Sequence, residues 1–193
     1  MELITQAVLV QAIRDVNAMD CAQKVALADE IFSQQPNLLA SILVLANMGV
    51  STLQLEVPLQ ILLVTFQAMK RSGHTWPIVQ EDEQERCMQR LTARMRFNEG
   101  LPERMAAGLV KQFCDGHSER NLLAFVYGYL GDHDLLRVRT DAEKYLLLAA
   151  LTSWSASPLL DVGPRWGDDS LGRVVKMGWL DAHPEPTRRP NGE

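Results

Sequence analysis

Residues 52–71 read TLQLEVPLQILLVTFQAMKR, and this stretch decides the fold. Apolar residues crowd positions 57–66 and leave almost no polar side on a helix. A helix that is apolar all round must be surrounded by protein. We therefore predict a core helix that begins at Ser51 or Thr52, with Pro58 either in its first turn or at a kink.

Two helices are predicted before the first proline. Apolar residues recur every three or four positions over 3–18, which is the period of one helix face. Asp20 is placed to cap a second helix, which stops before Pro36. The apolar face of this second helix consists of Cys21, Val25, Ala28 and Phe32.

The other helices are bounded by caps and breakers. Asn37 is the predicted cap of a helix over 38–48, which Gly49 closes. A breaker with Gly and Pro follows the core helix at 71–80. Helical periodicity then resumes over 81–96, 103–115, 118–130 and 140–154, the last behind a Thr140–Glu143 capping box.

The order of residues around the core helix recurs later in the chain. Phe32 followed by NLLASI at 37–42 matches Phe113 followed by NLLAFV at 121–126. The core helix is matched in the same order: Glu56, Leu59, Ile61, Val64 and Thr65 answer Glu143, Leu146, Leu148, Leu151 and Thr152. Either the chain is a tandem duplication with short loop insertions, or leucine-rich helices resemble one another by composition.

These patterns predict an all-α protein of about eight or nine helices in two tandem four-helix units. The first unit covers 1–72 and the second covers 81–156. The remaining 157–193 form an irregular tail with one short helix and a mobile C-terminus. We expect the tail to pack on the second unit through its tryptophans, of which Trp166 and Trp179 are candidate partner-binding residues.

Composition excludes several classes of protein. A chain of 193 residues that is 47% hydrophobic can bury a full core, and a net charge of -5 argues against general nucleic-acid binding. Three widely spaced cysteines fit neither a disulfide framework nor a four-cysteine zinc site, and so favour a reducing, cytoplasmic setting. The most apolar stretches, 38–46 and 59–66, are shorter than a bilayer span, and no basic leader precedes them.

His133-Asp134 is the best catalytic candidate. Adjacent His and Asp residues bind a divalent metal in all-α phosphohydrolases of the HD type, together with a His and an Asp from other helices. His117 or His74 would be the upstream ligand here, and the downstream ligand would be Asp161, Asp168 or Asp169. The alternative interpretation, which we favour, is a polar loop without metal.

Two other polar motifs have simpler explanations. Cys114 and His117 have the spacing of half a zinc site or of a nucleophile with its base, but Cys114 is equally a small buried residue at a helix end. A basic stripe that could contact nucleic acid or an acidic partner consists of Arg86, Arg90 and Arg94. Because Asp82 precedes Arg86 by four residues, a solvated, salt-bridged helix face is the preferred interpretation.

Charge is distributed unevenly. Residues 1–70 carry three basic and six acidic side chains, whereas 71–140 carry ten of each sign. So few charges leave apolar helix surface uncovered unless another surface packs on it. We therefore expect a non-enzymatic protein–protein interaction or scaffolding module, without cofactor or metal, that binds a second copy as a homodimer or another protein. The alternatives are the metal-dependent hydrolase and a helical regulator that contacts nucleic acid.

Overall fold

Every regular element that the structure describes is a helix. The computed structural model describes residues 4–73, 76–98, 119–136 and 140–155, with isolated positions at 102, 104, 105, 108, 109, 111 and 117. Within these residues there is no strand, and the all-α prediction is confirmed. The tail at 157–193, including Trp166 and Trp179, lies outside the described residues, as does most of the predicted helix at 103–115.

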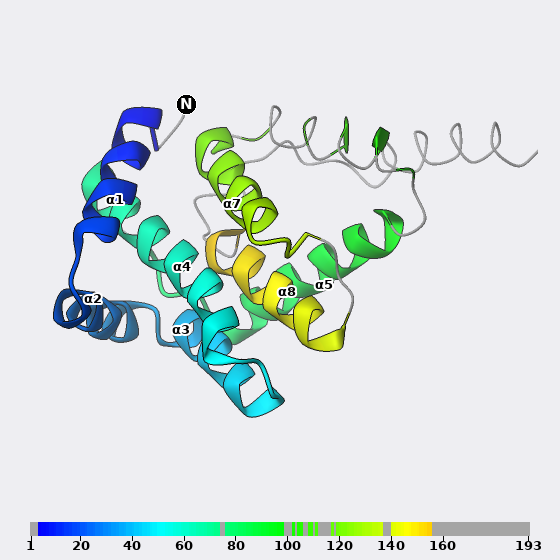
Figure 1. The fold of residues 1–193 in the computed structure, drawn as a ribbon, viewed down its shortest axis with the longest axis horizontal. Coiled ribbons are helices and arrows are strands. Elements are labelled where there is room, and N and C mark those ends of the chain that lie inside the picture. The colour runs from blue at the N-terminus through cyan, green and yellow to red at the C-terminus, as the bar shows by residue number, and fades with distance from the viewer. Residues whose placement is uncertain are drawn as a thin grey trace, which may run out of the picture. The chain divides into compact units, whose positions relative to one another are not determined.

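Short connections join the helices from α1 to α4 (Figure 1). Their bounds are α1 Gln6–Ala18, α2 Cys21–Gln34, α3 Pro36–Leu43, the 3₁₀-helix η1 Val44–Met48, α4 Thr52–Ser72, α5 Glu81–Asn98, α7 Arg120–Asp132 and α8 Asp141–Ser155.

Two predicted helix starts are confirmed in atomic detail. The Asp20 carboxylate accepts a hydrogen bond from the Gln23 amide at 2.8 Å, and the Gln23 side chain accepts one from the Asp20 amide at 2.9 Å. Ser51 and Gln54 form the same reciprocal capping box at the start of α4. Each box satisfies backbone donors that have no partner inside the helix.

Other boundaries differ from the sequence prediction. Gln35, and not Asn37, is the N-cap of α3, and Pro36 is its first residue. Pro58 lies beyond the first turn, inside α4, where its ring removes one donor from the helix. The predicted helix over 38–48 changes to 3₁₀ geometry after residue 43, and Gly49 closes it with φ +84° as expected.

Helix α4 is the centre of the core. It packs against α1, α2, α3, α7 and α8, and Figure 1 shows it between α1 and α8. Ile61 through Phe66 are all buried, which confirms that the middle of this helix is surrounded by protein. Replacing one such large residue by Ala typically costs about 2–5 kcal/mol, so α4 holds the other helices together.

The starts of α1 and α5 are held by matching hydrogen bonds. In the first clamp, Gln35 Oε1 accepts from the Val79 amide at 3.0 Å and Asn37 Nδ2 donates to the Val79 carbonyl at 2.9 Å. The second clamp, formed by Glu119 and Asn121, makes the same two bonds to Ile4, at 3.0 and 3.3 Å. Gln35 and Glu119 are the N-caps of α3 and α7, and both are only 1% exposed.

Helix α2 buries a different side from the apolar face named by its sequence pattern. Leu27 and Ile31 are buried, in a helix that packs on α3 and α4. Val25 and Phe32 are 54% and 58% exposed instead. An apolar helix face normally points to the core, so the outward position of this one is the unexpected feature of the fold.

Candidate interaction surface

Three exposed apolar residues of α2 and one half-buried alanine, which packs partly against the core, form one continuous row, the α2 stripe. Its members are separated by four, three and four residues, which places them on the same side of a helix. The first is an exposed free thiol and the third is half-buried. The α2 stripe consists of Cys21, Val25, Ala28 and Phe32.

Sequence reasoning named these residues as the apolar face of the second helix and did not say whether that face meets the core or the solvent. Their spacing fits a core-facing helix as well as it fits a binding surface. The signal that distinguishes the two is a second apolar pair on the same helix, Leu27 and Ile31, four residues apart. A helix with two apolar sides and only one neighbouring core leaves one side in water.

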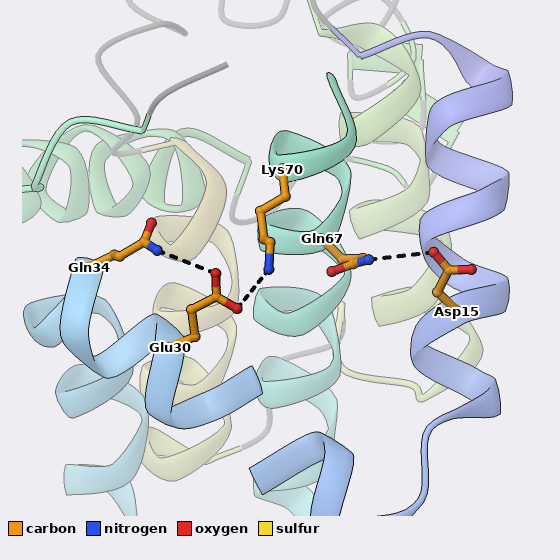
Figure 2. A network of polar contacts seen from close by, with 5 residues as sticks. All are labelled: Asp15, Glu30, Gln34, Gln67 and Lys70. Carbon is orange, nitrogen blue, oxygen red and sulfur yellow. Dashed lines mark hydrogen bonds and ion pairs between the residues drawn. The ribbon is translucent and has the colours of Figure 1, made fainter. Parts of the chain in front are cut away.

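Polar contacts fix α2 and α1 onto α4 and so set the direction of the α2 stripe. Lys70 of α4 pairs with Glu30 of α2 at 2.7 Å, and Gln34 donates to the same carboxylate (Figure 2). Gln67 of α4 reaches Asp15 of α1 in the same view. Exposed ion pairs are each worth about 0–1 kcal/mol, so these contacts define the orientation more than they add stability.

Asp15 has the most strongly connected carboxylate in this region. Gln11 donates to it at 2.9 Å, and Arg71 of α4 forms a salt bridge with it. The hydrogen bond from Gln11, followed by the contacts from Arg71 and Gln67, lowers the pKa of Asp15 against the opposing effect of burial. Asp15 therefore remains ionised at any pH near neutrality.

A second exposed apolar group lies where α3, η1 and α4 meet, at the light-blue to cyan turn in Figure 1. We name it the apolar corner. Its side chains come from three different elements and not from one helix face. Leu53 is 74% exposed, and the other members are about half exposed. The apolar corner consists of Leu43, Val44, Met48 and Leu53.

His133 and Asp134 lie exposed in the turn that closes α7. The centroid of the His133 ring lies 4.4 Å from that of the Tyr129 ring, with the two planes tilted by 41°, and His133 Nδ1 is 2.8 Å from the Tyr129 carbonyl oxygen. Asp134 has a positive φ of 56°, the left-handed conformation that ends a helix. Burial, and then the charge of Glu56, raise the pKa of Tyr129.

The described residues do not include a grouped set of metal ligands. His117 accepts a hydrogen bond at Nδ1 from the Glu119 amide at 3.1 Å. Among the described residues, no three His, Cys, Asp or Glu side chains are grouped so that they could hold a metal ion. The other proposed ligands lie outside the described residues: His74, Cys114, Asp161, Asp168 and Asp169.

The predicted basic stripe on α5 is partly engaged within its own helix. Arg86 forms the expected ion pair with Asp82 at 2.8 Å, and both side chains are exposed. Arg90 is also exposed, whereas the side chain of Arg94 is outside the described part of the structure. The pairing fits a solvated helix face, as the preferred interpretation expected.

Comparison with known proteins gives no family assignment, because no family model, curated protein or solved structure matches the chain. Within the described helices, none combines the length and apolar character needed to cross a membrane. The α2 stripe is therefore judged on its own chemistry.

Proposed function

We propose that this chain is a non-enzymatic protein–protein interaction module that forms a homodimer. The observation that carries the proposal is the exposed α2 stripe. Three exposed apolar side chains in a row on one helix, with a half-buried alanine among them, are a surface that water solvates poorly. A reducing, cytoplasmic setting would keep the exposed Cys21 thiol free.

Charge supports self-association over binding to a charged ligand. The first seventy residues contain only nine charged side chains, and the α2 stripe itself contains none. In a two-fold dimer the same patch is buried on both subunits, so each exposed apolar group contributes twice. Full burial of a side chain such as Phe32 contributes about 1.5–3 kcal/mol.

Sedimentation velocity across a range of micromolar concentrations tests the proposal. We expect a reversible, concentration-dependent shift from the 21.6 kDa monomer to a species of twice that mass. A single 21.6 kDa species throughout this range would refute self-association.

We also propose that the chain is a tandem repeat of a four-helix unit. The two clamps support this idea. The first joins the start of α3, in the first unit, to the segment before α5, with which the second unit begins. The second joins the start of α7, in the second unit, to the segment before α1, with which the first unit begins. Buried residues of α3 and α7 also match in order: Leu38, Leu39 and Ile42 correspond to Leu122, Leu123 and Val126.

A crystal structure tests the repeat directly. Residues 3–70 should superpose on 84–156, with Leu38 over Leu122 and Leu59 over Leu146. Different helix orders or crossing directions in the two halves would refute the duplication.

A further inference from the structure

We infer that α2 of one copy packs antiparallel on α2 of a second copy, through the α2 stripe. This inference rests on the proposed homodimer and adds the surface and the orientation. It follows from the spacing and the size of the four stripe residues, which outweigh the charge of their neighbours.

The spacing of the α2 stripe is the same in both directions. Steps of four, three and four residues remain four, three and four when the helix is reversed. Two antiparallel copies related by a two-fold axis therefore align all four positions. Phe32 of one copy lies opposite Cys21 of the second, and Val25 lies opposite Ala28.

Side-chain size favours this orientation. Each antiparallel layer pairs one large residue with one small residue, so the two helices keep a constant separation and the layers interdigitate. A parallel pair would place Phe32 against Phe32 and Ala28 against Ala28. The helices would then be held apart at one layer and leave a gap at the next, which well-packed interfaces avoid.

Charge favours the parallel arrangement, but more weakly. Lys24 and Asp29 flank the α2 stripe on opposite sides, five residues apart, which is the spacing of ion pairs between parallel helices. An exposed ion pair changes an association constant by about five-fold at most. Burying one large apolar side chain changes it by about ten- to a hundred-fold. Packing therefore determines the orientation.

The surface is tested with single variants of the full chain. Phe32→Ala and Val25→Asp should each raise the dimer dissociation constant by about ten-fold or more, measured by sedimentation. Leu53→Ala, in the apolar corner, is the matched control, because Leu53 is more exposed than Phe32. It should leave the constant within about two-fold. Because these side chains are largely exposed, helical circular dichroism should remain that of the native chain.

The orientation is tested by oxidation. In the antiparallel dimer the two Cys21 thiols lie roughly 16 Å apart along the helix axis, too far for a disulfide. The Phe32→Cys variant should instead form a disulfide between native Cys21 of one copy and Cys at position 32 of the second copy. Peptide mass mapping detects this link after oxidation at protein concentrations above the raised dissociation constant of the variant.

Each other outcome identifies which idea fails. A native chain that never dimerises overturns the proposed homodimer and this inference together. A dimer that tolerates both Phe32→Ala and Val25→Asp leaves the homodimer intact and overturns the α2 surface. A Cys21–Cys21 disulfide in the native dimer overturns the antiparallel orientation in favour of the parallel one.

Discussion

The turn that follows η1 and the turn that follows α7 share one backbone conformation but carry different side chains. The Val50 amide donates to the Leu45 carbonyl at 3.2 Å, and the Leu135 amide donates to that of Leu130 at 2.9 Å. Gly49 in one turn and Asp134 in the other take the left-handed conformation. Hydrogen bonding fixes such a turn, and its exposed side chains are free to differ.

This comparison changes the meaning of the His-Asp pair. His133 occupies the position before the left-handed residue, which Met48 occupies in the first turn. Both are exposed, although one is polar and the other apolar. A thioether in the matching place shows that the fold requires no polar group there. Helix termination accounts for the left-handed conformation of Asp134.

The two clamps supply the comparison with the largest expected effect. Gln35→Ala removes the acceptor of the buried Val79 amide and the donor to the Trp76 and Pro77 carbonyls. We expect a loss of about 1–3 kcal/mol in unfolding free energy, measured by urea denaturation.

The second clamp should tolerate a change of charge better than a loss of its acceptor. Glu119→Gln keeps an acceptor oxygen for the Ile4 amide, so it should cost less than Glu119→Ala. Glutamine already performs this role at position 35. If Glu119→Gln is as damaging as Glu119→Ala, the two clamps are not equivalent.

The two turns supply a smaller effect. An alanine at position 49 would contact no atom within 4 Å, so only its left-handed backbone is strained. Gly49→Ala should cost about 1 kcal/mol. Asp134→Asn should cost less than about 0.5 kcal/mol, because asparagine also tolerates this conformation. Equal costs in urea denaturation would indicate a specific stabilising contact of the Asp134 carboxylate.

Local chemistry made several features predictable from the sequence. Asp20 and Ser51 cap helices through bonds to residues only three positions away, and Gly49 closes one within its own turn. Asn37 misled the prediction because its side chain donates to the carbonyl of Val79, a residue of the distant segment before α5. A pattern of capping residues contains no information about such a distant contact.

The candidate surface was only half predictable. The periodicity of α2 identified Cys21, Val25, Ala28 and Phe32 as one face, but which face meets the core depends on the position of α4. The switch to 3₁₀ geometry in η1 was also missed. A 3₁₀-helix has fewer residues per turn than an α-helix. The buried residue Leu45 of η1 therefore follows the buried Ile42 after three residues, whereas in α7 the buried Leu130 follows the buried Val126 after four.

The smallest expected effect concerns ion pairs on α1 and α5, the first helices of the two proposed units. Asp15 connects α1 to α4, whereas Asp82 pairs with Arg86 on the same helix. Because the pKa of Asp15 is lowered in the folded state, its contribution is present above its ordinary value of 3.8 and is lost as the pH falls through the folded value.

Asp15→Asn should therefore lower the urea midpoint slightly at about pH 6, and the difference from the native chain should shrink towards about pH 3. Asp82→Asn is the control, since its exposed pair lies within one helix and should change the midpoint less. The same small difference at both pH values would mean that the Asp15 carboxylate contributes through packing and not through its charge. Added salt should weaken the Asp15 effect in the same way, because solvent ions screen exposed pairs.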